Sequence, residues 1–154
     1  MLMGNYGTPL ELCRIINKAI VCQSYLGNNI YMLNISNNLA VKKNKPIIYI
    51  IGRQHPGETP ASFIMEGIIK TLLSNREEMI ELRDEFLIKV VPMVNVDGVI
   101  NGNYRSNISG NDVNRQWFFP SKKFHPEIYH LKEDILSNKK YVKFFLDVHA
   151  HSRK

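Results

Sequence analysis

The chain of 154 residues is predicted to fold as an α/β protein, with helices packed on a layered sheet. Short apolar runs of strand length alternate with segments of helical periodicity, which is the pattern of a sheet covered by helices. One run, Ile47–Ile51, is continuously apolar, as expected of a strand covered on both faces. The length and an apolar content of 44% suit a single domain.

The first expected elements are a helix and a hairpin. The segment 8–19 begins with a capping threonine, a first-turn proline and a glutamate that completes a capping box, and apolar residues then recur at helical spacing. Strands are expected over Ile20–Leu26 and Ile30–Ile35. Residues 27–29, Gly-Asn-Asn, accept the positive φ of a tight turn, so this hairpin adds antiparallel strands at one edge of the sheet.

Regular elements then alternate with two irregular segments. The expected elements are strand Ile47–Ile51, helices Pro60–Ser74 and Arg76–Leu82, strand Phe86–Met93, helix Glu127–Leu136 and a second buried strand, Phe144–Val148. The irregular segments are the loop Arg53–Thr59 and the Asn- and Gly-rich stretch Asn95–Trp117. A long irregular stretch inside a compact domain is usually functional.

Charge and composition exclude several classes of protein. The 20 Lys+Arg against 14 Asp+Glu give a net charge of +6, which permits an anionic partner. The lysines are dispersed and no nucleic-acid-binding pattern is present, so a nucleic-acid partner is not predicted. No apolar run approaches the ~18 residues of a membrane span, and no signal peptide is recognisable, so no membrane association is predicted. Two cysteines favour a reducing, cytoplasmic location.

Side chains of the metal-binding type follow directly after two of the predicted strands. His55 and Glu58 come after Ile47–Ile51, and His149 comes after Phe144–Val148. Sites in open α/β sheets form beyond the carboxyl ends of the strands, so these side chains are expected to converge. Two imidazoles and one carboxylate leave a coordination position of zinc open, as in hydrolytic sites. Ordinary hydrogen-bonded histidines are the alternative.

The stretch Asn95–Trp117 adds groups that recognise carboxylates. Guanidinium groups bind carboxylates in bidentate fashion, so Arg105 and Arg115 suit a peptide with a free C-terminus. Asn114 is expected to hold the second carboxylate oxygen, and Asp112 to orient a zinc-bound imidazole. Solvated loop arginines are the alternative interpretation.

Five stretches carry a resemblance to a known family. They are HPGETPAS from His55, VPMVNVDGVINGNYR from Val91, GNDVNRQW from Gly110, HPEIYH from His125 and DVHAHSRK from Asp147, with a weaker likeness in SYLGNNIYMLNIS from Ser24. In this order they resemble the zinc metallocarboxypeptidases of the carboxypeptidase A type, and more closely the cytosolic carboxypeptidases that trim glutamates from protein tails such as tubulin. The resemblance covers most of residues 20–154. It implies a three-layer α/β/α fold with a mixed central sheet, present here in incomplete form.

The resemblance assigns a metal centre. His55, Glu58 and His149 would bind one Zn²⁺ ion, and Asp112 would be the outer hydrogen-bond partner of His55.

It also assigns the substrate-binding residues. Arg105 would polarise the scissile carbonyl and stabilise the oxyanion, and Asn114 and Arg115 would hold the terminal carboxylate of the substrate. His151 and Ser152 would line the neighbouring wall without touching zinc.

Two departures from the family pattern matter. Val96 stands where the family usually has proline, which changes no ligand. The sequence stops at Lys154, and the family's general-base glutamate and substrate-covering tyrosine lie further downstream. We therefore interpret residues 1–154 as the N-terminal portion of a zinc carboxypeptidase catalytic domain, with no second domain. A general base contributes roughly 10²–10⁴-fold, so this chain alone is expected to be inactive or very weak. The strand Phe144–Val148 is also expected to have an unpaired edge or an uncovered face.

The leading functional prediction is hydrolysis of the C-terminal peptide bond of proteins or peptides in the cytoplasm. Removal of C-terminal or side-chain-linked glutamates, as from tubulin tails, is the finer hypothesis. The alternative is a catalytically inactive fragment that binds zinc and peptide. A related zinc amidase is a third interpretation, against which the arginine pair argues.

Overall fold

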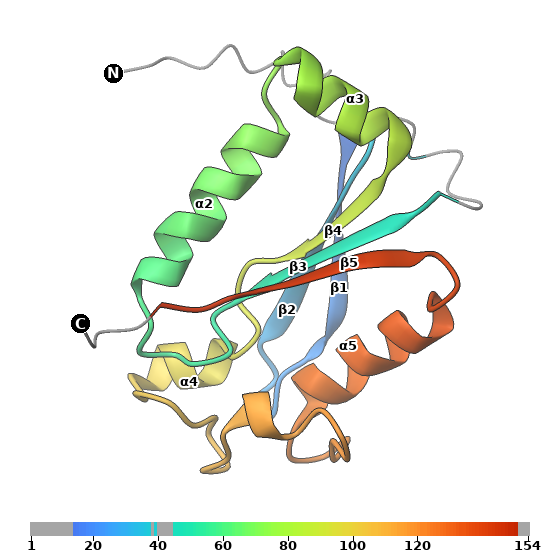
Figure 1. Ribbon diagram of the computed structural model, residues 1–154. Helices are drawn as coiled ribbons and strands as arrows, with labels where there is room; N and C mark the ends of the chain where they lie inside the picture. The colour runs from blue at the N-terminus through green and yellow to red at the C-terminus, as the bar shows by residue number, and fades with distance from the viewer. Residues whose placement is uncertain (1–13, 38, 40–44, 151–154) are drawn as a thin grey trace.

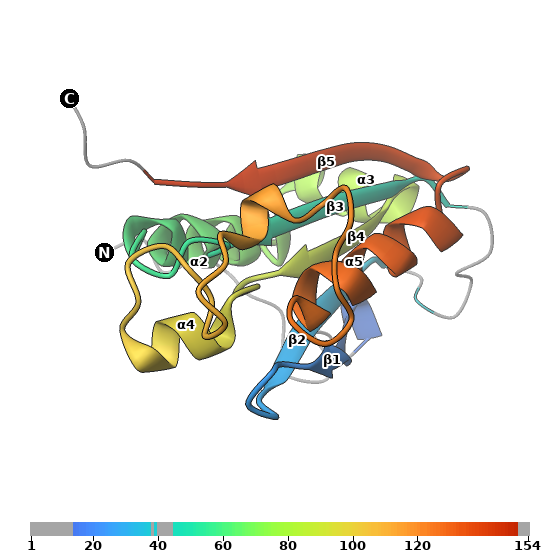
Figure 2. The ribbon, with the colours of Figure 1, turned by 90° about the horizontal axis from the view of Figure 1, so that it is seen from below.

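The computed structural model describes residues 14–37, 39 and 45–150, whose five strands form one mixed sheet in the order β1-β2-β4-β3-β5. The strands are β1 Ile16–Gln23, β2 Asn29–Ile35, β3 Ile47–Gly52, β4 Leu87–Val91 and β5 Val142–Val148. The helices are α2 Pro60–Leu72, α3 Glu77–Glu85, α4 Val96–Asn101, the 3-10 helix η1 Val113–Arg115 and α5 Pro126–Ser137. Helices α2 and α3 lie against one face of the sheet and α5 against the other (Figures 1 and 2). The predicted three-layer α/β/α architecture is confirmed.

Each face of the sheet has its own hydrophobic core, because side chains alternate along a strand. In β3, Tyr49 and Ile51 pack toward α5, in a cluster with Ile128 and Leu131 of that helix. Ile50 packs toward α2 on the other face. The uninterrupted apolar run of β3 therefore serves two cores, as the sequence predicts for a covered strand.

The hairpin at one edge is confirmed, although its first strand begins earlier than expected. β1 and β2 pair in antiparallel fashion from Ile16, opposite Ile35, to Gln23, opposite Asn29, and Gly27 in the turn has a φ of 83°. The prediction of helix through Ala19 is wrong after Ile15, because ladder pairing with β2 overrides the helical spacing. The predicted start of that helix, residues 8–13, lies outside the described residues.

β2 also pairs antiparallel with β4, and β4, β3 and β5 run parallel to one another. The carboxyl ends of β3 and β5 therefore lie side by side. This topology brings the loop after Gly52 next to the residues that follow Val148.

The strand β5 is only partly buried, which corrects one prediction. Phe144, Phe145 and Leu146 are 55%, 41% and 36% exposed, whereas Val148 is buried. β5 pairs with β3, and its other edge has no strand partner in the described part of the chain. This arrangement agrees with the expectation of an uncovered edge.

The stretch Asn95–Trp117 contains two short helical elements that the sequence pattern did not predict. The side chain of Asn95 accepts a hydrogen bond from the backbone N–H of Gly98 at 3.0 Å and caps α4. The side chain of Asp112 accepts one from the backbone N–H of Asn114 at 3.0 Å and caps η1. Side-chain caps, rather than periodicity, organise this stretch. No helix of the described residues has the length and apolar character to span a membrane.

Candidate metal centre

The loop after β3 is held in place by its own first residue and by a distant backbone segment. Arg53 adopts a left-handed φ of 56°, and its guanidinium donates to Ser62 Oγ and, at 2.6 Å, to the carbonyl of Pro56. The backbone N–H of Gly57 donates to the carbonyl of Tyr104 at 2.8 Å. These contacts fasten the turn that carries His55 both to the start of α2 and to the segment that carries Arg105.

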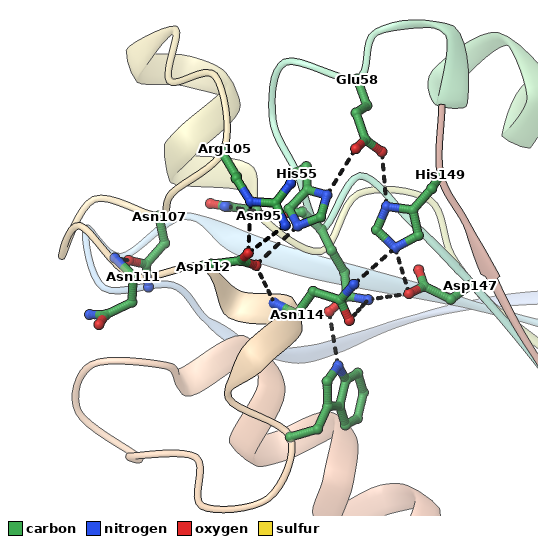
Figure 3. Close-up of polar contacts among 12 residues, drawn as sticks. His55, Glu58, Asn95, Arg105, Asn107, Asn111, Asp112, Asn114, Asp147 and His149 are labelled. Carbon is green, nitrogen blue, oxygen red and sulfur yellow. Dashed lines mark hydrogen bonds and ion pairs between the residues drawn. The ribbon is translucent and has the colours of Figure 1, made fainter. Parts of the chain in front are cut away.

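The structure brings His55, Glu58 and His149 together (Figure 3). Nδ1 of His55 lies 2.9 Å from one oxygen of the Glu58 carboxylate, and Nδ1 of His149 lies 2.9 Å from the other. The three candidate ligand atoms all lie within 4.8 Å of one another. The convergence that the sequence predicts is therefore present.

Both imidazoles are anchored through their far nitrogens. Nε2 of His55 lies 3.0 Å from a carboxylate oxygen of Asp112, as the family resemblance implies. Nε2 of His149 lies 2.7 Å from a carboxylate oxygen of Asp147, a partner that our sequence analysis missed. The spacing Asp-x-His at the end of a strand was the available signal, because residues i and i+2 of a strand point the same way.

These contacts define what the centre can hold. A carboxylate accepts the proton on Nε2, so a neutral imidazole directs the lone pair of Nδ1 inward, toward Glu58. Two such lone pairs facing a carboxylate require a cation between them. The donor set of two nitrogens and a carboxylate oxygen fits zinc, with a coordination position left for a reactant.

The charges of the centre perturb the pKa values of its groups. Burial acts to raise the pKa of Glu58, but the backbone N–H of Ala150 and the imidazoles of His55 and His149 outweigh it, and the net shift is downward. For Asp112, burial is likewise outweighed by His55 and Arg105, and the pKa is lowered. Burial acts to lower the pKa of His149.

The hydrogen-bond partners of His149 oppose the effect of burial on its pKa. Hydrogen bonds and negative charge from Asp147 and Glu58 raise its pKa above the usual 6.5. The carboxylates of the centre therefore favour a positive charge at the place that suits a metal ion.

The predicted substrate residues lie around this centre. The guanidinium of Arg105 donates to Asp112 through Nε at 2.8 Å and lies 2.7 Å from the same oxygen through Nη2. Nδ2 of Asn114 lies 3.3 Å from Nε2 of His149. Arg115, next to Asn114 in η1, is exposed and forms no ion pair with the described residues. His151 and Ser152 lie outside the described residues.

The structure is thus a mixed α/β sheet whose strand ends gather two imidazoles and a carboxylate, which is the donor set of a candidate metal site. Residues 12–153 match the family model described as zinc carboxypeptidase, and the chain belongs to that family. The resemblance inferred from the motifs is confirmed.

The curated relatives are cytosolic carboxypeptidases. Human cytosolic carboxypeptidase 1 is 38% identical over 148 residues, which cover 89% of this chain and 12% of the relative. Mouse cytosolic carboxypeptidase 6 is 43% identical over 119 residues, which cover 75% of this chain and 22% of the relative. The chain thus spans about an eighth of the first relative's length.

Solved structures agree with this family. A putative carboxypeptidase A from Shewanella denitrificans superposes with a TM-score of 0.83 at 29% identity, over 92% of this chain and 37% of that one. The Pseudomonas aeruginosa metallo-carboxypeptidase, solved in complex with (2-guanidinoethylmercapto)succinic acid, gives a TM-score of 0.77 at 31% identity, over 88% of this chain and 35% of that one.

Proposed function

We propose that this chain provides the metal centre of a zinc-dependent metallocarboxypeptidase that hydrolyses the C-terminal peptide bond of proteins or peptides. The observation that carries the proposal is the convergence of His55, Glu58 and His149, each imidazole backed by a carboxylate, in a member of the zinc carboxypeptidase family. Residues 1–154 are proposed to be the N-terminal portion of the catalytic domain. The match to the Shewanella structure covers 92% of this chain but only 37% of that one, which supports the proposal that this chain is a portion of such a domain.

One Zn²⁺ ion is the proposed cofactor, held by Nδ1 of His55, Nδ1 of His149 and the carboxylate of Glu58. Asp112 and Asp147 fix the proton of each imidazole on Nε2, so that both Nδ1 atoms remain ligands. When bound, zinc supplies a Lewis acid that polarises a carbonyl and lowers the pKa of water.

Three residues are proposed to bind the substrate. The guanidinium of Arg105 donates a hydrogen bond to Asp112, and Asp112 contacts His55. The guanidinium of Arg105 is therefore held beside the metal centre and is suited to stabilise an oxyanion. Asn114 and Arg115 are adjacent in η1 and are proposed to hold the terminal carboxylate of the peptide. The guanidinium of Arg115 is exposed and has no ion pair among the described residues, which supports this role.

Glutamate is the proposed C-terminal residue, including side-chain-linked glutamates of acidic tails such as those of tubulin. The net charge of +6 and the motif resemblance support an acidic substrate. The names of the cytosolic relatives support a cytoplasmic location.

One observation favours the alternative of zinc and peptide binding without hydrolysis for these 154 residues. Within the described part of the chain, the carboxylates that contact the centre are Glu58, Asp112 and Asp147, and each contacts a histidine. None of them is free to act as a general base.

Peptide hydrolysis by the full-length protein tests the proposal. We expect zinc-dependent release of glutamate from a peptide with a free C-terminus and no release from the same peptide as its C-terminal amide. Equal cleavage of the amide would contradict the exopeptidase assignment, and equal release of leucine would contradict only the glutamate preference. Zinc-dependent peptide binding without turnover by residues 1–154 would favour the alternative for these residues.

A further inference from the structure

The side chain of Gln54 joins the metal centre to the proposed carboxylate-binding residues. Gln54 is fully buried, and its Nε2 donates to Asp147 at 2.5 Å and to Oδ1 of Asn114 at 3.4 Å. Its Oε1 accepts a hydrogen bond from the indole N–H of Trp117 at 2.9 Å. The backbone carbonyl of Gln54 accepts one from Asn95 at 3.1 Å, so the residue is fixed at both ends.

The partners of Gln54 determine which way its amide points. An indole N–H can only donate, so the oxygen of the amide faces Trp117. An ionised carboxylate can only accept, so the nitrogen faces Asp147. A flipped amide would set two donors against each other at one end and two acceptors at the other.

The fixed amide of Gln54 in turn orients Asn114. Because Nε2 of Gln54 is a donor, the atom of Asn114 that faces it is the oxygen, and the amide nitrogen of Asn114 lies 3.3 Å from Nε2 of His149. Since that Nε2 donates its proton to Asp147, it cannot accept from Asn114, whose N–H groups remain for another acceptor. Figure 3 shows Asn114 and Asp147 on the side of His149 that is remote from Glu58. An N–H group presented there is what a substrate carboxylate requires.

Gln54 also acts on His149 through Asp147. One oxygen of Asp147 receives both Nε2 of Gln54 and Nε2 of His149, so a single carboxylate is held from two sides. Its other oxygen is buried and has no hydrogen-bond partner among the described residues. Without Gln54, the contact with His149 alone would hold the first oxygen.

We propose that Gln54 is a positioning residue that couples the two halves of the site: it presents the amide N–H groups of Asn114 to the substrate carboxylate and holds Asp147 against the zinc-binding His149. This role rests on the proposed function. The neighbouring Trp117 contributes to this role, because its indole N–H, together with Asp147, fixes the orientation of the Gln54 amide.

Two variants of the full-length protein test the role, with Gln116→Leu as the matched control. Gln116 lies in the same stretch, and its side chain forms no hydrogen bond with the described residues. Gln54→Leu removes every side-chain hydrogen bond at nearly constant volume. Trp117→Phe removes the indole donor and part of the ring, and keeps a smaller aromatic ring beside Phe145.

Zinc affinity and the KM for peptide are measured for each variant. We expect Gln54→Leu to weaken zinc binding about tenfold, because outer hydrogen-bond partners of metal ligands have effects of this size. We expect both variants to raise the KM for peptides with a free C-terminus about tenfold, the value of one hydrogen bond to a charged group, with a smaller change in kcat. The Gln116→Leu control should change neither quantity.

A measurement independent of activity separates positioning from misfolding. The indole N–H resonance of Trp117 in an ¹H–¹⁵N spectrum is identified as the one that Trp117→Phe removes. In Gln54→Leu this resonance should shift while the dispersion of the remaining spectrum stays that of a folded protein. If Gln54→Leu does not fold, the KM of Trp117→Phe for peptide tests the proposed role of Gln54.

The outcomes distinguish the two proposals. A wild-type protein that binds zinc and cleaves peptide, with both quantities unchanged in the variants, overturns the role of Gln54 and leaves the proposed function intact. A wild-type protein that binds neither zinc nor peptide overturns both.

Discussion

A single methyl group at Gly57 is expected to separate the two segments that form the metal centre. An alanine Cβ at this position would lie 2.6 Å from the carbonyl oxygen and 3.0 Å from Cα of Tyr104. Both are backbone atoms, so no side-chain rotation can relieve the overlap. The carbonyl oxygen also accepts the hydrogen bond of the Gly57 N–H, which would be lost as the segments move apart.

The size of the effect follows from these contacts. Overpacking costs about 1–3 kcal/mol, and the lost hydrogen bond adds about 0.5–1.5 kcal/mol. We expect Gly57→Ala to lower the free energy of unfolding by about 2–4 kcal/mol in urea denaturation. Because Arg105 follows Tyr104 and contacts Asp112, we also expect zinc affinity to fall at least about tenfold.

Gly67→Ala is the matched control. Gly67 lies inside α2, and a Cβ built there meets no atom within 4 Å. Alanine is the better helix former, so this variant should raise the free energy of unfolding by about 0.4–1 kcal/mol and leave zinc affinity unchanged. A Gly57→Ala protein with wild-type stability and wild-type zinc affinity would refute the argument, because it would show that the Tyr104 segment yields freely.

Three further perturbations probe other parts of the structure. Asp112→Asn keeps a hydrogen-bond acceptor for His55 but removes the charge, so zinc affinity should fall about 10–100-fold in a chelator competition, and an unchanged affinity would contradict the orienting role. Zinc must displace a proton from His149, whose pKa is raised by Asp147 and Glu58. Below that pKa, the zinc affinity should fall about tenfold per pH unit. A zinc affinity that stays constant down to pH 6 would contradict this competition. Burial and the nearby charge of Asp97 raise the pKa of Glu127. As pH rises above about 4.5, the unfolded chain therefore loses a proton that the folded chain keeps, and the free energy of unfolding should fall. Glu127→Gln should flatten that slope in denaturation curves at several pH values, whereas Glu133→Gln, on an exposed position of α5, should retain it.

Local signals in the sequence predicted much of the fold. The turn at Gly27 and the uninterrupted apolar run of β3 are such signals, and both elements are present as predicted. The assignment failed where pairing between strands outweighs local spacing, as at Ile16–Ala19, which lie in β1. It also failed for the exposure of β5, because an apolar run does not reveal which of its faces a neighbour covers.

The candidate site divides in the same way. His55 and Glu58 share one turn, and their spacing identified them together with His149 as candidate ligands. Asp147 was missed although it lies only two residues before His149. Gln54 was missed because its importance depends on a contact with Asp147, 93 positions away in the chain. Only the parallel pairing of β3 with β5 brings these two side chains together.

The hydrogen-bonded groups of the centre themselves argue for a cation. Asp112, His55, Glu58, His149 and Asp147 form a continuous series in which carboxylates alternate with imidazoles. With neutral imidazoles, the three carboxylates outnumber the guanidiniums of Arg105 and of the neighbouring Arg53, so the cluster is net negative. This negative charge, chiefly that of Asp147 and Glu58, favours a proton on His149 and outweighs the effect of burial, so the pKa of His149 is raised. A divalent cation placed among the two Nδ1 atoms and Glu58 replaces that proton and satisfies the inward lone pairs at the same time. A metal ion and a proton therefore compete for the same negatively charged centre. Groups that raise the pKa of His149 also affect the affinity of the centre for a metal ion.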